Sequence, residues 1–175
     1  MLNLGISTSI TKPSKGFAAL SNASACRLIL GSLPGVLSIQ RQEYYAHPRN
    51  VFWRIMGSLF GFDPLLPYEK RVETLKASGV ALWDVCASAH RDGSLDSAIK
   101  NHAVNDFAGF YIEHPRLERI FFNGQKAAAL YRQRVVDLPE GSRFLPTWTL
   151  PSTSPANAGL TYEEKLRRWS ALRTS

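Results

Sequence analysis

The chain has 175 residues, of which 45% are hydrophobic, and it carries a formal net charge of +7 at pH 7. This length fits one domain with a real core. No apolar run approaches the ~20 residues of a membrane-spanning helix, so no such span is expected. The positive charge favours a polyanionic partner, of which nucleic acid is the usual one.

The cysteines and histidines argue against a metal site. Cys26 and Cys86 each lie in or beside an apolar run, which indicates buried free thiols in a reducing compartment. Two thiols without a CxxC motif exclude a four-cysteine iron–sulfur cluster. The four histidines show no metal-ligand spacing with acids or thiols. We therefore expect no metal, and a cytoplasmic location.

Residues 1–24 are rich in Ser, Thr, Ala and Lys and contain no acid. A transit peptide has such a composition, and so does a frayed N-terminus. We prefer the second interpretation and predict a flexible extension over 1–24, although Gly16 and Phe17 can already pack on the domain. A single α/β domain is then expected over 25–175.

The first predicted strand, Cys26–Leu30, breaks into the turn Gly31–Gly35, as a buried parallel strand does when it enters a ligand-binding loop. The segment Tyr44–Trp53 follows, in which aromatics, a histidine and an amide surround a proline. A helix is predicted from about Pro48 to Phe60, with a glycine next to it at the C-cap position.

Strands and helices alternate through the rest of the chain. We predict a helix from Pro67 to Gly79, a strand at Val80–Val85, helix and loop at Ser94–Ala108, a strand at Leu117–Phe122, a helix at Gln125–Gln133, a strand at Arg143–Trp148 and a final helix opened by the capping box Thr161-x-x-Glu164. This alternation predicts an α/β fold, a three-layer α/β/α sandwich around a central, mainly parallel four-stranded sheet. Ligands bind such sheets at the carboxyl ends of the strands. Three unusual loops each follow a strand and should converge there: 31–53, 123–126 and 150–159.

Asn123 ends a predicted strand just before a glycine. Its primary amide offers an acceptor and a donor side by side, which pairs with a ring edge carrying C=O next to N–H. Uracil and hypoxanthine present such an edge, whereas cytosine and adenine do not. An Asn-Gly turn is the alternative interpretation.

The segment before the first long helix supplies further candidates. Tyr44 and Tyr45 can stack on a planar base or pack in the core. His47 can act as a base, donate to a leaving group, or cap the helix. Asn50 cannot be a true general base, because its amide takes up no proton near neutrality, but its carbonyl oxygen can hold a water molecule.

The loop Pro151–Gly159 contains small residues, hydroxyls and two prolines. Its backbone N–H groups and hydroxyls can grip phosphates, or it can be a plain connection. Basic side chains near these segments can supply a phosphate track or be solvated surface charges: Arg49, Arg143, Lys165, Arg167 and Arg168.

These residues together resemble the uracil-DNA glycosylase superfamily, from about Cys26 to the C-terminus. The first motif is Gly31-Ser32-Leu33-Pro34-Gly35 and the second is Leu150-Pro151-Ser152-Thr153-Ser154-Pro155. Between them, His47-Pro48-Arg49-Asn50-Val51-Phe52-Trp53 is similar to the mismatch-specific branch. The whole pattern most resembles the hypoxanthine-DNA glycosylase family.

The resemblance implies a DNA repair glycosylase that flips a deaminated base out of double-stranded DNA and hydrolyses its N-glycosidic bond, leaving an abasic site. It implies no organic cofactor. Because no lysine lies in the motifs, we expect a hydrolase without a Schiff-base lyase step. We also expect a monomer that needs no protein partner or membrane and that associates with a bacterial-type nucleoid. The residues expected to bind the base are Tyr45, Asn123, Gly31, Ser32 and Gly35. Those expected to contact DNA are Ser152, Thr153, Ser154, Ala156, Asn157, Lys165 and Arg168.

Two positions depart from the superfamily pattern. Leu33 stands where many members have an Asp or Asn that positions water, and in the hypoxanthine family the expected substitute maps onto Asn50. Leu150 stands where a His or Asn often assists the leaving base, which favours purines. Gly35 leaves room for a larger ring. We therefore expect Asn50 and His47 to be catalytic and hypoxanthine to be the substrate base.

Three other functions stay open at this point. One is a uracil or mismatch glycosylase on the same scaffold. Another is a catalytically inactive protein that binds damaged DNA, given the leucines in both motifs. The third is an α/β protein that binds free nucleotides, which would show no salt-sensitive affinity for duplex DNA.

Overall fold

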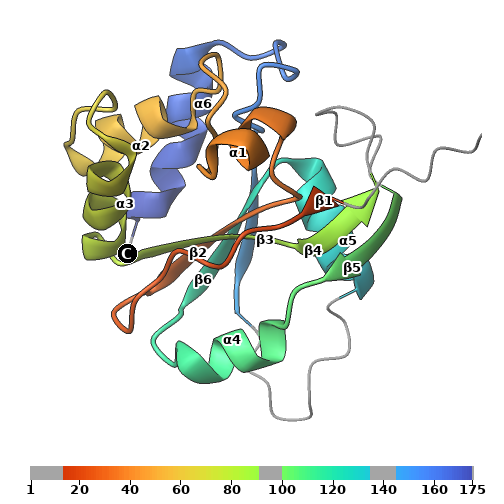
Figure 1. The fold of residues 1–175 in the computed structure, drawn as a ribbon. Coiled ribbons are helices and arrows are strands. Elements are labelled where there is room, and N and C mark those ends of the chain that lie inside the picture. The colour runs from red at the N-terminus through yellow and green to blue at the C-terminus, as the bar shows by residue number, and fades with distance from the viewer. Residues whose placement is uncertain (1–13, 91–99, 135–144, 175) are drawn as a thin grey trace, which may run out of the picture.

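The computed structural model describes residues 14–90, 100–134 and 145–174 of the chain. Its centre is a four-stranded sheet in the order β3-β2-β6-β7, and every neighbouring pair of strands in it is parallel. Their carboxyl ends therefore share one edge of the sheet (Figure 1). The strands are β2 (Arg27–Gly31), β3 (Val80–Asp84), β6 (Arg119–Asn123) and β7 (Thr147–Leu150).

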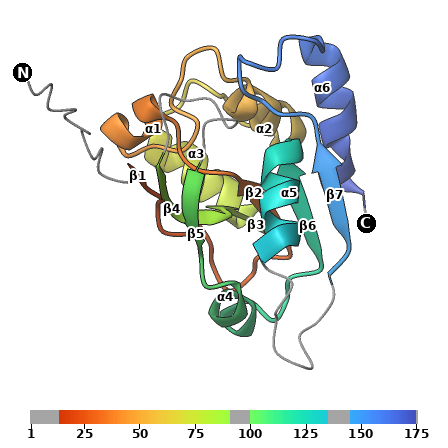
Figure 2. The ribbon, with the colours of Figure 1, turned by 90° about the vertical axis from the view of Figure 1, so that its right-hand side faces the viewer.

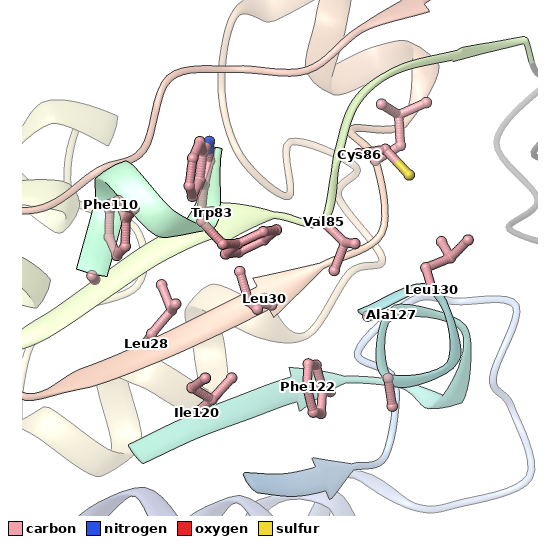
Figure 3. Packing of buried hydrophobic residues seen from close by; sticks show 14 of the residues in the cluster. Leu28, Leu30, Trp83, Val85, Cys86, Phe110, Ile120, Phe122, Ala127 and Leu130 are labelled. Atoms are coloured by element: carbon pink, nitrogen blue, oxygen red, sulfur yellow. The ribbon is translucent and has the colours of Figure 1, made fainter. Parts of the chain in front are cut away.

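Helices cover both faces of this sheet (Figures 1 and 2). Because side chains alternate along a strand, Leu28 and Phe122 belong to the core under one face (Figure 3), and Ile29 and Phe121 to the core under the other. This arrangement confirms the three-layer α/β/α sandwich. The first face is covered by α4 (Phe107–Glu113) and α5 (Gln125–Arg134), and the second by α2 (Phe52–Phe60), α3 (Tyr68–Ala77) and α6 (Tyr162–Trp169).

A second, antiparallel sheet was not predicted. It has the order β1-β4-β5 and continues from β3, since only Val85 separates β3 from β4. The prediction of helix and loop over Ser94–Ala108 is wrong for residues 100–104, which form β5, while 91–99 lie outside the described residues. The three strands are β1 (Ser14–Lys15), β4 (Cys86–His90) and β5 (Lys100–Val104).

The segment 14–24, which the sequence analysis placed in a flexible extension, packs on the domain. The Gly16 amide donates to the Ala87 carbonyl at 2.8 Å, and Leu20 forms an isolated bridge with Leu82. The Trp83 indole donates to the Phe17 carbonyl at 3.0 Å. The described structure thus begins well before residue 25, and residues 1–13 lie outside it.

The segment between β2 and α2 differs from its prediction. A short helix, α1 (Val36–Arg41), follows the first motif, and α2 begins at Phe52 rather than near Pro48. The physical reason is Asn50: its side-chain oxygen accepts a hydrogen bond from the Phe52 amide at 3.0 Å, which makes a turn before the helix. The end of α2 at Gly61, a left-handed C-cap, is confirmed.

The C-terminal elements agree closely with the sequence. The capping box of Thr161 and Glu164 is present at the start of α6, which continues into a short 3-10 helix, η2 (Ser170–Arg173). Trp169 and Leu172 are fully buried. The last strand begins later than predicted, at Thr147, and residues 143–144 lie outside the described part of the chain. No helix among the described residues is long and apolar enough to cross a membrane.

Candidate active site

A cavity of about 520 Å³ lies at the carboxyl ends of the parallel strands. The loops 31–53, 123–126 and 150–159 all contribute to its wall, so the expected convergence of the three loops is confirmed. The predicted site residues that line the cavity are Gly31, Ser32, Gly35, Tyr45, His47, Asn50, Asn123, Ser152, Thr153, Ser154, Ala156, Asn157 and Arg168.

The two tyrosines before α2 have different surroundings. Tyr45 lies in the left-handed region (φ 56°) and stacks on Phe52, with ring centroids 4.0 Å apart and planes 27° apart. Tyr44 is only 2% exposed and packs edge-on against Phe17. Burial raises the pKa of the Tyr44 phenol, and the nearby negative charge of Asp84 raises it further. Tyr45 is therefore the ring that can stack on a base, and Tyr44 is a core residue.

Asn50 and His47 form one turn at the cavity wall. The Asn50 amide N–H donates to the His47 carbonyl at 2.8 Å, and the Asn50 side-chain oxygen accepts from Phe52. That oxygen keeps a second lone pair for a water molecule. The His47 Nδ1 accepts a hydrogen bond from the Arg49 amide at 3.1 Å, so in the neutral ring Nε2 carries the hydrogen. His47 can therefore act as a donor through Nε2.

The Asn123 amide is buried, at 7% exposure, and has a fixed orientation. Its Nδ2 donates to the Thr153 hydroxyl, and its Oδ1 accepts from the Thr153 amide, both at 2.9 Å. Gly124 next to it has a φ of +99°, and a Cβ there would lie 3.0 Å from the Ser152 Cβ, so this turn requires glycine. Among the described residues, the second Nδ2 hydrogen and the second Oδ1 lone pair of Asn123 have no protein partner.

The loop after β7 is held in place from both sides. The Val51 amide donates to the Thr153 carbonyl at 3.1 Å, which joins the loop to the start of α2. On α6, the Trp169 indole donates to the Pro151 carbonyl at 2.9 Å and the Lys165 ammonium donates to the Asn157 carbonyl at 2.7 Å. Hydrogen bonds within the chain therefore hold the loop against α2 and α6.

Lys165, predicted to contact DNA, is 5% exposed and does not line the cavity. Its burial lowers the pKa of the ammonium group. The structure thus places Lys165 beneath the loop, where it donates to the Asn157 carbonyl.

The hydroxyls of Ser152 and Ser154 accept from the amides of Ser154 and Ala156, at 3.2 and 3.3 Å. A phosphate bound by those amides would replace these two contacts.

Sequence reasoning missed two charged residues of the cavity wall. Asp84 is the last residue of β3 and is 3% exposed, and Lys126 lies in the first turn of α5. Asp84 ends a predicted strand, so the rule that ligands bind at strand ends could have found it.

No group of three His, Cys, Asp or Glu residues that could hold a metal ion occurs in the described parts of the chain.

A parallel α/β/α sandwich in which one cavity is lined by an aromatic ring, a fixed amide and basic side chains is an arrangement suited to a planar base. The comparisons with known proteins narrow the class of protein. The family described as the Uracil DNA glycosylase superfamily matches residues 19–173. The chain therefore belongs to the uracil DNA glycosylase superfamily, and the expected enzyme class, a DNA glycosylase that hydrolyses N-glycosyl bonds, is confirmed.

Individual relatives agree with this assignment. A protein of Methanosarcina acetivorans named Hypoxanthine DNA glycosylase is 41% identical over 144 residues, which cover 82% of this chain and 87% of that protein. A protein of Methanosarcina barkeri with the same name is 40% identical over 114 residues, covering 65% of this chain and 72% of that protein. The solution NMR structure of a Methanosarcina acetivorans protein provisionally named a uracil DNA glycosylase superimposes with a TM-score of 0.76 at 36% identity, covering 93% of this chain and 100% of that one.

Proposed function

We propose that the protein hydrolyses the N-glycosidic bond of deoxyinosine in double-stranded DNA, releasing hypoxanthine and leaving an abasic site. The observation that carries this proposal is the Asn123 amide, which is buried in the cavity wall, fixed by Thr153, and still able to donate its second Nδ2 hydrogen. The names of the two relatives support the choice of base.

The orientation of the Asn123 amide favours a deaminated base. Thr153 pairs with the edge of the amide on which Oδ1 and Nδ2 lie side by side, so the remaining Nδ2 hydrogen and the remaining Oδ1 lone pair point in different directions. The remaining Nδ2 hydrogen can donate to the C6 carbonyl oxygen of hypoxanthine. Adenine presents an amino group at that position, so a donor would face a donor. An unpaired buried polar group costs about 1–3 kcal/mol, so this contact discriminates by roughly 5–150-fold. Tyr45 adds a stacking surface, and Gly35 leaves space for a purine.

The turn that contains His47 and Asn50 supplies the chemistry. Water forms a bond to C1′ of the deoxyribose as the bond from C1′ to N9 of the base breaks, and the electron pair of that bond leaves with the base. Asn50 holds the water through its side-chain oxygen, and His47 donates a hydrogen bond through Nε2 to the departing base. The proton released by the water finally resides on the free hypoxanthine. Positioning, rather than proton abstraction by a strong base, therefore carries the step.

The loop after β7 and the basic groups beside it provide the contact to DNA. The loop is held by hydrogen bonds within the chain, and Arg168 lines the same cavity. The net charge of +7 attracts the phosphate backbone. We propose that Ser152, Thr153, Ser154, Ala156 and Asn157 press against the duplex, and that the protein acts as a monomer in the cytoplasm, at the nucleoid.

A panel of duplexes tests this function. Each duplex carries one inosine, uracil or xanthine at the same position, and alkaline cleavage reveals abasic sites after single-turnover incubation. We expect the fastest release from inosine. Faster release from uracil would overturn the choice of base, and tight binding to the inosine duplex without any abasic product would show an inactive damage-binding protein.

A further inference from the structure

Asp84 brings a carboxylate into the cavity from a strand that carries no recognised motif. In the parallel pairing of β2 and β3, Asp84 stands opposite Gly31, the first residue of the Gly31–Gly35 motif. Beyond this pair the Val85 amide donates to the Gly31 carbonyl at 2.8 Å, and the Cys86 amide donates to the Ser32 carbonyl at 3.0 Å. These bonds fix Asp84 beside the motif.

The space beside Gly31, where any other residue would have a Cβ, shows where the carboxylate lies. A Cβ on Gly31 would be 2.4 Å from Asp84 Oδ1 and 3.0 Å from the Tyr45 hydroxyl oxygen. The carboxylate therefore occupies the space that any other residue at position 31 would fill, between the first motif and the stacking tyrosine. All three residues line the cavity.

The charge of Asp84 differs from that of its surroundings. The other charged side chains of the cavity wall, Lys126 and Arg168, are basic, and Asp84 is the one acid among the described residues that line it. At 3% exposure the carboxylate is largely removed from water, which is costly for a charged group. After burial, the negative charge of Asp84 is the next cause that raises the pKa of Tyr44, as expected for a carboxylate close by.

Breaking a bond from C1′ to a base leaves positive charge on the sugar ring, shared between C1′ and O4′. A negative group fixed near that ring stabilises the transition state more than the uncharged ground state. The first motif offers no such group, because Leu33 is apolar and 5% exposed. We propose that Asp84 is a further catalytic residue: its carboxylate, delivered by β3 beside Gly31, faces the deoxyribose of the flipped nucleotide and stabilises the cation formed as the base leaves. This role rests on the proposed glycosylase function, but not on which base is removed.

The test uses Asp84→Asn, which keeps the shape of the side chain and removes its charge. The matched control is Asp106→Asn, at the exposed N-cap of α4, where an amide oxygen can still accept from Gly109. Both variants change the net charge equally, so a general effect on DNA affinity is common to them. We expect single-turnover release of the base to fall by ~10²–10³-fold in Asp84→Asn and to stay unchanged in the control.

A second measurement separates charge stabilisation from a structural role. Affinity is compared for two duplexes, one with a cationic pyrrolidine in place of the deoxyribose and one with a neutral tetrahydrofuran. We expect the full chain to prefer the cationic analogue, the control to keep this preference, and Asp84→Asn to lose it while binding the neutral analogue normally. Equal binding of both analogues by the unaltered protein, or an unchanged preference in Asp84→Asn, would overturn the proposal. If the unaltered protein prefers the cation but releases no base from any duplex, the proposed function fails instead.

Discussion

Replacing Asn50 by alanine removes two interactions that the structure allows us to separate. The side-chain oxygen of Asn50 accepts from the Phe52 amide at the start of α2, and the same carboxamide is proposed to hold the attacking water. Loss of the first is a folding effect, and loss of the second is a catalytic effect. Asn50→Asp is the matched variant, because it keeps an acceptor oxygen for Phe52 and a further one for water.

The two effects differ greatly in size. Removal of the side-chain acceptor of this turn costs about 1 kcal/mol, which for a chain of this length lowers the melting temperature by about 2–4 °C. A domain with the usual stability of about 5–15 kcal/mol stays almost wholly folded after such a loss. Removal of a group that positions a reactant costs ~10²–10³-fold in rate. At 25 °C the loss of rate in Asn50→Ala is therefore catalytic.

The assay is single-turnover release of hypoxanthine from an inosine duplex, with the dissociation constant measured separately by fluorescence anisotropy. We expect Asn50→Ala to bind the duplex normally but to release the base ~10²–10³-fold more slowly. Asn50→Asp should retain most of the rate and the full melting temperature. Full activity in Asn50→Ala would refute the role in holding water, and equal inactivity of both variants would show that the acceptor oxygen is not the group that matters.

Two further variants test the base contact and the core. Asn123→Asp keeps an acceptor for the Thr153 amide but loses the donor to the base, so release from inosine by the folded variant should fall by roughly 5–150-fold. An unchanged rate would contradict base reading by this amide. Burial raises the pKa of Tyr111 and Tyr131 above 10.0, so above a pH of about 10 the unfolded chain loses protons that the folded chain retains, and the free energy of unfolding falls as the pH rises. Urea titrations at several pH values above about 10 measure this fall, which Tyr111→Phe should weaken. If the free energy of unfolding falls with pH as steeply in Tyr111→Phe as in the unaltered chain, the raised pKa of Tyr111 is contradicted.

The central sheet and the helices around it could be predicted because their sequence signals are local. Residues 28–30 form an unbroken apolar run, as a strand covered on both faces requires, and the capping box of Thr161 and Glu164 identifies the start of α6. The convergence of the three loops then follows from parallel topology alone. These signals located nearly all the predicted site residues in one cavity.

The features that the sequence did not reveal depend on individual pairings and side-chain hydrogen bonds, which leave no periodic pattern in the sequence. β1 has only two residues and pairs with β4, which lies far along the chain, so the sequence contains no periodic pattern that predicts β1. The start of α2 was placed too early because Pro48 suits a first turn, whereas the Asn50 side chain forms a turn of its own there. Burial of Lys165 was likewise not visible, since the carbonyl it binds belongs to a loop rather than to its own helix.

The bond between the Val51 amide and the Thr153 carbonyl has a consequence for which lesions are repaired fastest. It joins the turn that contains Asn50 to the loop whose Thr153 fixes Asn123, so the chain itself sets the spacing between these two amides. If that spacing is rigid, the difference between lesions lies in the cost of extruding the nucleotide from the duplex. If inosine is the substrate, we expect the order in which it is removed opposite different partners to follow how weakly each pair is held in free DNA.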